Sequence, residues 1–434
     1  MEFRKVCVLG LGYIGLPTAS TFATHGLKVV GVDVNPKIVQ TLCNGELHIH
    51  EPGLRTLVQA ALDSGNLIIS QKPEQSDAFI IAVPTPINET KHADMSYVVA
   101  ATEAIIPFLK PGCLVVLEST SPPRTTLEVV APILESSGMK AGIDFYLVYS
   151  PERVLPGQIL RELIENDRVI GGINRASAQA GHDLYSLFVR GEIILTDATT
   201  AEMVKLMENT YRDVNIAIAN EFCRLAERFS IDVWETISIA NRHPRVNILN
   251  PGPGVGGHCI GVDPWFLIEA APDITDLIRT ARQVNDSQPA FIVDLVQRAL
   301  GAEKASDLAG KRIAALGLAY KSDVDDLRES PAIKVARMLS KLGAFVFAYE
   351  PYNVEARLQD ILVVPTLEKA VSEADLILLL VAHKTFRELQ PGQLIDLTQA
   401  RLLVDVTNQL PSEPWALAGF KLHRLGASTR IPVD

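Results

Sequence analysis

A glycine-rich turn near the N-terminus constrains the fold more than any other feature of this sequence. The apolar run Val6–Leu9 leads directly into Gly10-Leu11-Gly12-Tyr13-Ile14-Gly15, and a helical pattern follows. In a strand–turn–helix unit of this kind, the glycines permit a tight turn, close approach of the backbone to a pyrophosphate, and close packing of the helix against the strand. The amino end of the helix presents N–H groups and a positive dipole to the phosphates. The turn therefore predicts a sheet that binds a dinucleotide.

An acidic residue in the next strand indicates which dinucleotide is bound. Asp33 ends the apolar run Lys28–Asp33, 18 residues after Gly15. A carboxylate at this position suits the ribose hydroxyls of NAD and repels the additional phosphate of NADP. Thr85 and Thr120 follow two further strand-like runs, at the rim where ligands bind in open α/β sheets. NAD is the expected cofactor, and an FAD site or a glycine-rich turn without a ligand are the alternatives.

The order of predicted elements divides the chain into three parts. Strand-like and helix-like segments alternate over residues 1–197 and again over 301–434, although the second of these parts lacks the full glycine fingerprint. Residues 198–300 instead carry apolar residues mainly at helical spacing. Alternation predicts parallel, doubly wound sheets. We expect an α/β protein with two doubly wound Rossmann-like domains joined by a central all-helical segment.

Composition excludes several classes of protein. The 434 residues carry 40 basic and 51 acidic side chains, a formal charge of −11, so we expect no nucleic-acid partner. The five cysteines are widely spaced and form no CxxC pair, which argues against a disulfide framework and a zinc site. No apolar run approaches the ~20 residues that a membrane helix needs, and the chain starts without a signal-peptide pattern. We expect a cytoplasmic protein with no metal and no membrane partner.

One cysteine lies in an unusual loop. Cys259 ends the run Gly252-Pro253-Gly254-Val255-Gly256-Gly257-His258-Cys259, which is too irregular and too rich in glycine for packing alone to explain. Beside an NAD site, a thiol can add to an aldehyde to give a thiohemiacetal, which loses a second hydride and becomes a thioester. Burial as a small apolar side chain is the alternative, and we apply it to the other four cysteines.

Polar residues on the predicted central helix fit the same chemistry. Lys205 and Asn209 are four residues apart, so both project from one face. A lysine and an amide on one face can stabilise an alkoxide or exchange a proton with it, whereas a solvated lysine is the alternative. Arg212 shares that face and can meet a phosphate or a sugar substituent.

These residues occur in longer motifs that resemble a known family, the nucleotide-sugar 6-dehydrogenases (UDP-glucose/GDP-mannose dehydrogenases). The resemblance covers essentially the whole chain, in order. It rests on the N-terminal fingerprint, VPTP, ESTSPP, SPERVLPG, the helix with Lys205 and Asn209, GPGVGGHC, and Lys321 followed by DLRESP. It implies NAD-dependent, four-electron oxidation of a nucleotide sugar at C6.

The resemblance also implies roles for individual residues. Cys259 holds the aldehyde, with Asp263 supporting its site, while Lys205 and Asn209 stabilise oxyanions and exchange protons at C6. Glu152 and Thr120 lie near the hydrolytic water. The residues expected to bind NAD are Gly10, Gly12, Tyr13, Ile14, Gly15, Asp33, Thr85, Thr120 and Arg328.

The rest of the chain has implied roles too. Tyr320 and Lys321 face the nucleotide sugar, which makes 301–434 a UDP-sugar-binding domain. The central helices of 198–300 form a homodimer.

Departures from the UDP-glucose branch indicate the sugar. A second glutamate of that branch is replaced here by Pro156, and its lysine before the cysteine loop is missing from residues 247–253. These variants resemble the N-acetylhexosamine branch, and leave Glu152 as the first candidate to activate water. By analogy the substrate site also includes Arg153, Val154, Arg212, His243, Arg245 and Gly256.

The expected substrate is a UDP-N-acetylhexosamine, with UDP-N-acetyl-D-mannosamine preferred. UDP-N-acetylglucosamine and UDP-glucose are the nearer alternatives. A two-electron alcohol dehydrogenase and a non-catalytic NAD-binding scaffold protein are the more remote ones.

Overall fold

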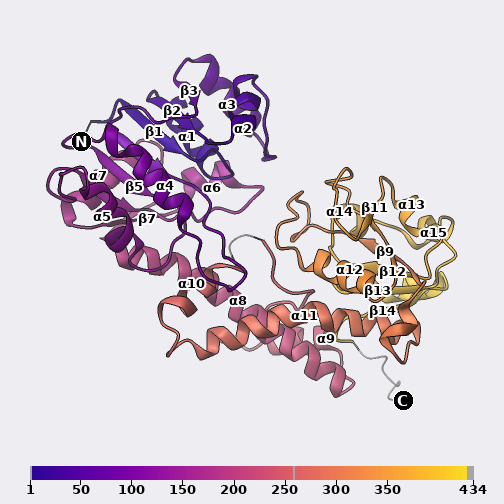
Figure 1. The fold of residues 1–434 in the computed structure, drawn as a ribbon. Helices are drawn as coiled ribbons and strands as arrows, with labels where there is room; N and C mark the ends of the chain where they lie inside the picture. The colour runs from indigo at the N-terminus through magenta and orange to yellow at the C-terminus, as the bar shows by residue number, and fades with distance from the viewer. Residues whose placement is uncertain (1, 258–259, 428–434) are drawn as a thin grey trace. The chain divides into compact units, whose positions relative to one another are not determined.

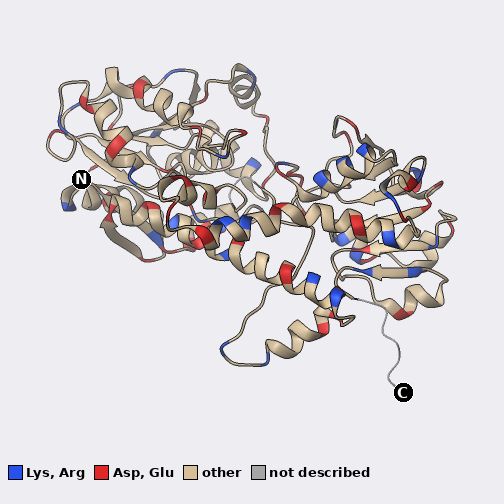
Figure 2. Ribbon diagram, turned by 60° about the horizontal axis from the view of Figure 1, so that its bottom comes forward, with Lys and Arg blue, Asp and Glu red and all other residues tan. Residues whose placement is uncertain are grey.

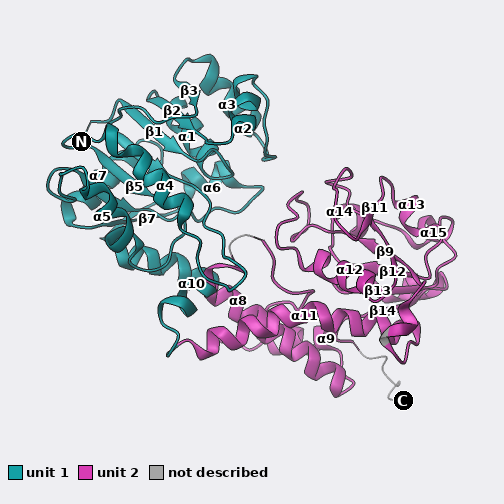
Figure 3. Ribbon diagram, viewed as in Figure 1, with its two compact units in different colours: residues 1–209, 265–274 teal, residues 210–264, 275–434 magenta. Residues whose placement is uncertain are grey.

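The computed structural model describes residues 2–257 and 260–427, and the chain forms two compact units (Figure 3). One unit comprises residues 1–209 and 265–274, and the other comprises residues 210–264 and 275–434. Two helices belong partly to each unit: α8 (Ala198–Arg228) and α10 (Asp263–Ala270). Each unit has its own sheet.

An eight-stranded sheet forms the centre of the first unit (Figure 1). Its spatial order is β3-β2-β1-β4-β5-β6-β7-β8, and all neighbours are parallel except β6 and β7. The strands are β1 (Lys5–Leu9), β2 (Lys28–Val32), β3 (Leu67–Ser70), β4 (Ala78–Ile81), β5 (Leu114–Leu117), β6 (Tyr146–Tyr149), β7 (Arg168–Gly172) and β8 (Ile193–Asp197). The helices are α1 (Gly15–Thr24), α2 (Pro36–Cys43), α3 (Leu54–Asp63), α4 (Ser96–Ile105), η1 (Ile106–Phe108), η2 (Thr126–Val130), α5 (Ala131–Glu135), α6 (Ile159–Glu165) and α7 (Arg175–Tyr185).

Both faces of this sheet are buried, because side chains alternate along each strand. In β1, Val6 and Val8 join the apolar core on one face, where α1 and α7 pack. Cys7 and Leu9 join the core on the other face, with residues of α4 and α5. A continuous apolar run such as VCVL is therefore the expected signature of a central parallel strand.

The second unit is built on a six-stranded, all-parallel sheet of order β11-β10-β9-β12-β13-β14. The strands are β9 (Arg312–Leu316), β10 (Phe345–Tyr349), β11 (Leu362–Val363), β12 (Leu376–Leu379), β13 (Leu402–Asp405) and β14 (Lys421–Arg424). The remaining helices are α9 (Val233–Ala240), α11 (Asp276–Leu300), η3 (Ala305–Leu308), α12 (Pro331–Lys341), α13 (Leu367–Val371), α14 (Lys384–Arg387), α15 (Pro391–Ile395) and α16 (Ser412–Leu417).

The two sheets share the arrangement of their first five strands, β3-β2-β1-β4-β5 and β11-β10-β9-β12-β13. The predicted fold class, two doubly wound α/β domains with a helical segment between them, is therefore confirmed. The compact units divide α8 after Asn209, and the predicted domain boundaries after residues 197 and 300 remain predictions.

Helices α8 and α11 are joined by polar contacts within the second unit. Asp213 pairs with Arg282 (2.5 Å), and Nδ2 of Asn220 donates a hydrogen bond to Oδ1 of Asn285 (2.9 Å). Acidic and basic residues are interspersed along both helices (Figure 2). In the part of the chain that the structure describes, no helix is both long enough and apolar enough to cross a membrane.

The buried pair of Asp213 and Arg282 gives a prediction about stability. Their side chains are 0% and 2% exposed, and burial raises the pKa of Asp213 against the opposing effect of the Arg282 charge. Replacing Asp213 with Ala leaves Asp286 (2.5 Å) as the remaining acidic partner of the buried guanidinium, so we expect the free energy of unfolding to fall by about 2–3 kcal/mol in urea denaturation.

The matched control is Glu373→Ala, which breaks an exposed pair with Arg312 (2.7 Å; side chains 39% and 68% exposed). This change should cost at most about 1 kcal/mol. Equal losses in the two variants would contradict the argument from burial.

Candidate active site

The glycine-rich turn fits a dinucleotide for three separate reasons. Gly10 has φ +89°, and a Cβ there would lie 2.5 Å from the carbonyl oxygen of Ala82. A Cβ on Gly15 would lie 1.8 Å from the Gly10 oxygen, so helix α1 can approach the turn only without one. A Cβ on Gly12 would meet nothing within 4 Å. Packing explains Gly10 and Gly15, whereas Gly12 borders open space, as close approach of a phosphate requires.

Asp33 holds this turn from the end of β2. Its Oδ2 accepts a hydrogen bond from the Leu11 N–H (3.0 Å), and its Oδ1 accepts one from the Asn35 N–H (2.9 Å). The predicted residues of this unit therefore lie at the carboxyl ends of neighbouring strands. Gly10, Gly12, Tyr13, Ile14 and Gly15 follow β1, Asp33 follows β2, Thr85 follows β4, and Thr120 follows β5.

Glu152 reaches the same edge with a partner that the sequence analysis missed. Its Oε2 lies 3.1 Å from Nη1 of Arg168, and its Oε1 accepts from the Arg153 N–H (2.8 Å). Arg168 is the first residue of β7, the strand that runs against its neighbour β6. The register pairs Tyr149 with Gly171, so the start of β7 extends beyond the end of β6, where Glu152 lies.

A second carboxylate, that of Glu118, also pairs with Arg168. Nη2 of Arg168 lies 2.6 Å from Oε1 of Glu118, and the Tyr185 hydroxyl donates to the same oxygen (2.5 Å). The guanidinium carbon lies 3.9 Å from the centre of the Tyr185 ring, and Nε of Arg168 donates to Oγ of Ser150 (3.0 Å). The side chains of Glu118 and Arg168 are 0% and 5% exposed. Arg168 is thus fixed between two carboxylates.

The surroundings of Glu118 and Arg168 shift the pKa values of both side chains. Burial raises the pKa of Glu118 to about 7, with the Glu152 charge adding to the rise and the Arg168 charge opposing it. Burial lowers the pKa of Arg168, but the neighbouring carboxylates outweigh that effect and raise it overall, so the guanidinium stays charged.

Helix α8 contributes Lys205 and Asn209 to this unit. Both residues are buried, with exposed fractions of 8% and 6%. One turn earlier, the buried Glu202 accepts hydrogen bonds from the N–H groups of Arg124 (2.5 Å) and Thr126 (2.8 Å), in the segment after Thr120. These bonds fix the helix to the end of β5. No local sequence pattern indicates these bonds, because the partners are 76 and 78 residues apart.

The segment with Arg153 and Val154 is held at both ends. Nη1 of Arg153 pairs with Oε1 of Glu208 on α8 (2.7 Å). Glu51, which is 5% exposed, accepts from the N–H groups of Gly157 and Ile159 (2.8 Å each). The contacts of Glu51, Glu202 and Glu208 therefore bring Thr120, Glu152, Arg153, Lys205 and Asn209 together in one unit.

In the second unit, the cysteine loop packs against the residues after β9. A Cβ on Gly256 would lie 2.9 Å from Cβ of Tyr320, and one on Gly257 (φ +82°) would lie 2.9 Å from the Tyr320 ring. The Gly257 N–H donates to the Arg328 oxygen (3.2 Å). These contacts bring Gly256, Tyr320 and Arg328 together. Cys259 lies outside the described residues.

Other predicted residues of this unit lie apart from that contact. Lys321 is exposed beside Tyr320, and the Arg328 side chain pairs with Asp326 (2.7 Å). Arg212, His243 and Arg245 are exposed on α8 and after α9, and among the described contacts none joins them to the cysteine loop. Asp263, 2% exposed, starts α10.

The fold and the glycine turn define a protein with a Rossmann-type dinucleotide-binding domain, and comparison with known proteins identifies the family of the whole chain. Residues 4–189 match the NAD binding domain, 199–287 the central domain and 314–412 the UDP binding domain of the UDP-glucose/GDP-mannose dehydrogenase family. The chain belongs to this family, which confirms the predicted resemblance and NAD as the cofactor.

Three proteins illustrate which dehydrogenases are similar to this chain. UDP-N-acetyl-D-mannosamine dehydrogenase of Methanococcus maripaludis strain C7 is 47% identical, over 98% of this chain and 97% of the relative. NDP-N-acetyl-D-galactosaminuronic acid dehydrogenase of Ralstonia nicotianae is 49% identical, over 93% and 96%. The structure of UDP-D-ManNAc dehydrogenase from Pyrococcus horikoshii has a TM-score of 0.90 at 41% identity, covering 98% of this chain and all (100%) of that chain.

The raised pKa of Glu118 predicts how stability depends on pH. The folded chain holds this proton more tightly than the unfolded chain does, since the pKa rises from 4.5 to about 7. The resulting stabilisation is complete below about pH 4.5 and is lost as the pH rises through about 7. Glu118→Gln cannot ionise, so the melting temperature of the variant relative to the parent protein should increase between about pH 5 and pH 8. A difference that is constant with pH would contradict this assignment.

Proposed function

We propose that the chain catalyses the NAD-dependent oxidation of UDP-N-acetyl-D-mannosamine at C6 to the uronate, in two hydride transfers. The observation that carries this proposal is that Thr120, Glu152, Lys205 and Asn209 belong to the compact unit that bears the glycine turn, where Glu202 and Glu208 of helix α8 bind their neighbouring segments. The family's UDP binding domain supports a UDP-sugar substrate, and the N-acetylated sugar follows the relatives and the departures at Pro156 and residues 247–253.

The first oxidation needs a site that holds the C6 oxygen as it loses its proton. NAD, when bound at the turn of Gly10, Gly12 and Gly15, accepts a hydride. Lys205 and Asn209 are buried donors one helical turn apart, so they stabilise negative charge on that oxygen where water is largely excluded. Lys205 also exchanges the proton.

The second oxidation passes through the cysteine. The Cys259 thiolate adds to the aldehyde carbon to give a thiohemiacetal, which loses a hydride from C6 to become a thioester. Water attacks the thioester carbon, the C–S bond breaks, and the acid and the thiol are released. Two hydrides leave one sugar, so two NAD molecules are reduced.

Glu152 is suited to activate that water. Each of its oxygens already accepts one hydrogen bond, from Arg168 and from the Arg153 N–H, and each has a further lone pair. Arg168 fixes the carboxylate, and Glu118 balances the charge of Arg168. Thr120 lies at the end of β5, close to the cofactor edge.

A second sugar has specific support. The relatives from Ralstonia are 48–49% identical and are named for N-acetyl-D-galactosaminuronic acid. Kinetics with UDP-ManNAc, UDP-GlcNAc, UDP-GalNAc and UDP-glucose, with NADH counted per sugar consumed, separate the candidates. We expect the highest kcat/KM for UDP-ManNAc and a ratio of about two NADH per sugar. A ratio near one, or a preference for UDP-glucose, would overturn the proposal.

Replacing the nucleophile tests the covalent route. Cys259→Ser should lower the steady-state rate of uronate formation by at least about a thousandfold, because the acyl intermediate depends on the thiolate. The first hydride transfer should persist in part, measured as NADH in a single turnover. Cys43→Ser, a change at an exposed free cysteine, is the control and should turn over like the parent. Uronate formation by Cys259→Ser at the parental rate would exclude the mechanism.

We also propose a homodimer through the central helices. Exposed apolar side chains follow one side of α8, and of the residue directly after it, at spacings of seven, four, three and four residues: Tyr211, Ile218, Phe222, Leu225 and Phe229. A stripe of this length on a helix is typical of an interface between copies.

The three-part organisation 1–197, 198–300 and 301–434 gives the cofactor, the interface and the UDP-sugar each its own segment. A reducing cytoplasm keeps the Cys259 thiol available.

A charged substitution in the stripe tests the dimer. Phe222→Glu should convert the protein to a monomer of 47.3 kDa in size-exclusion chromatography with light scattering, because it places a charge in an apolar interface. Glu221→Gln, at the neighbouring exposed position, should leave the mass unchanged. A dimer in both variants would refute this interface.

A further inference from the structure

The second sheet repeats the first glycine of the turn and the acid that follows the next strand. Gly317 follows β9 as Gly10 follows β1, with φ +87° and +89°. The Gly317 N–H donates to the Tyr349 oxygen (2.9 Å), as the Gly10 N–H does to the Val32 oxygen (2.8 Å). Glu350, directly after β10, occupies the position that Asp33 has directly after β2. The second sheet thus has the framework of a dinucleotide site.

Both carboxylate oxygens of Glu350 already accept hydrogen bonds, and the side chain is buried. It is 0% exposed, and its Oε2 accepts hydrogen bonds from the N–H groups of Leu318 (2.7 Å) and Ala319 (2.9 Å). Its Oε1 accepts from the Tyr352 N–H (3.1 Å). Burial raises the pKa of Glu350, but the hydrogen bonds and the neighbouring His383 outweigh that effect and lower it. A carboxylate buried in this way cannot also bind the hydroxyls of a ribose.

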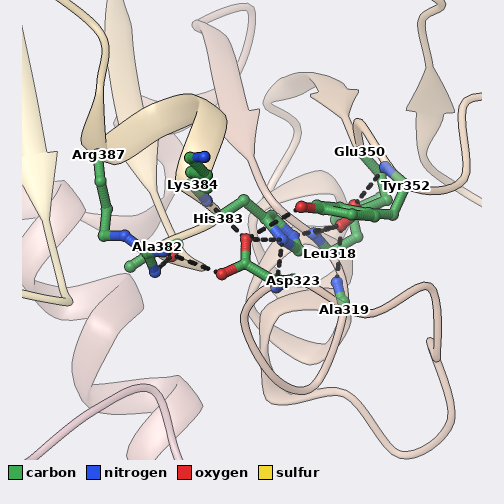
Figure 4. Close-up of polar contacts among 9 residues, drawn as sticks. All are labelled: Leu318, Ala319, Asp323, Glu350, Tyr352, Ala382, His383, Lys384 and Arg387. Carbon is green, nitrogen blue, oxygen red and sulfur yellow. Dashed lines mark hydrogen bonds and ion pairs between the residues drawn. The ribbon is translucent and has the colours of Figure 1, made fainter. Parts of the chain in front are cut away.

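His383 completes the arrangement (Figure 4). Its Nε2 lies 3.1 Å from Oε2 of Glu350, and its Nδ1 lies 2.9 Å from the backbone nitrogen of Asp323. Because that nitrogen is a donor, Nδ1 accepts, which places the ring proton on Nε2, where it donates to Glu350. His383 is 0% exposed and packs between the rings of Tyr352 and Phe386. The ring fills the position beside Glu350.

The two side chains hold the segment that carries Tyr320 and Lys321. Glu350 binds the N–H groups of the two residues before Tyr320, and His383 binds the N–H group of the second residue after Lys321. Tyr320 in turn contacts Gly256 and Gly257, in the loop that leads to Cys259. The segment is therefore fixed on one side by a buried acid–histidine pair and packs on the other against the cysteine loop.

We propose that Glu350 and His383 are positioning residues for the UDP-sugar: they set the backbone of residues 318–323, and through it the placement of Tyr320 and Lys321. The inference rests on the proposed function, which assigns those two residues to the nucleotide sugar. In the first sheet, the position after the second strand borders the cofactor turn. In the second sheet, Glu350 occupies this position, and together with His383 it holds the backbone of the loop that carries Tyr320 and Lys321.

Three substitutions of His383 separate its two hydrogen bonds. His383→Leu removes both, His383→Gln keeps a donor that can reach Glu350, and His383→Asn keeps an acceptor that can reach the Asp323 N–H. The matched control is Lys384→Ala, at the next residue, whose side chain is 66% exposed and pairs only with Glu388 (3.7 Å) among the described ion pairs.

We expect His383→Leu to raise the KM for the UDP-sugar and the Kd for UDP, measured by calorimetry, about tenfold, the effect of one lost buried hydrogen bond. The KM for NAD should change less than about twofold, since the cofactor turn is untouched. Gln and Asn should each recover part of the loss, and Lys384→Ala should match the parent. Hydrogen exchange of a peptide covering residues 318–323 should be faster in His383→Leu, with the peptide around Gly10 unchanged.

A purely structural role would give a different result: the KM values for UDP-sugar and NAD would rise together, with faster exchange in both peptides. That outcome, or parental UDP binding in His383→Leu, would overturn the inference. Failure of the proposed function would look different from failure of this inference. In that case neither the parent nor any variant would oxidise UDP-ManNAc, but UDP would still bind more weakly to His383→Leu than to the parent.

Discussion

Hydrogen bonds from backbone N–H groups to buried or half-buried carboxylates fix the loops on which this protein's sites depend. Asp33 holds the glycine turn, Glu51 the end of the segment after Glu152, and Glu202 the segment after Thr120. Glu350 does the same for the loop before Tyr320. A carboxylate is costly to bury unless its oxygens are satisfied, and loop amides supply the donors. Each acid is thereby stabilised, and each loop is restricted to one conformation.

The two sheets show how one framework supports different tasks. In the first, Asp33 is half-buried and Gly12 borders open space, so the crevice is open to a ligand. In the second, an acid longer by one methylene reaches two amides, and His383 covers it. The same topology therefore leaves the acid after one strand accessible and the acid after the other covered, and the difference lies in the length of one side chain and the presence of one ring.

The parts predictable from the sequence are those encoded by local patterns. The strands, the turn of Gly10 and the acid at Asp33 follow from spacing within about thirty residues. The partners Glu118 and Arg168 are 50 residues apart, and Glu350 and His383 are 33 apart, so no local pattern joins them. The charge of Arg168 at the start of an apolar strand was one usable sign, since a charged residue there needs a buried partner.

The reversed strand β7 determines more than the position of Arg168. Its neighbour β8 runs parallel to it, so α8 begins at Ala198, at the edge opposite the cofactor turn, and ten residues later Glu208 pairs with Arg153, beyond the end of β6. Lys205 and Asn209 therefore reach the cofactor edge only after a fixed number of helical turns. A single residue removed between Asp197 and Lys205 would rotate both side chains by about 100° and shift them by about 1.5 Å. The roles proposed for Lys205 and Asn209 thus depend on the rotational phase of one helix, which is set at the last residue of an edge strand.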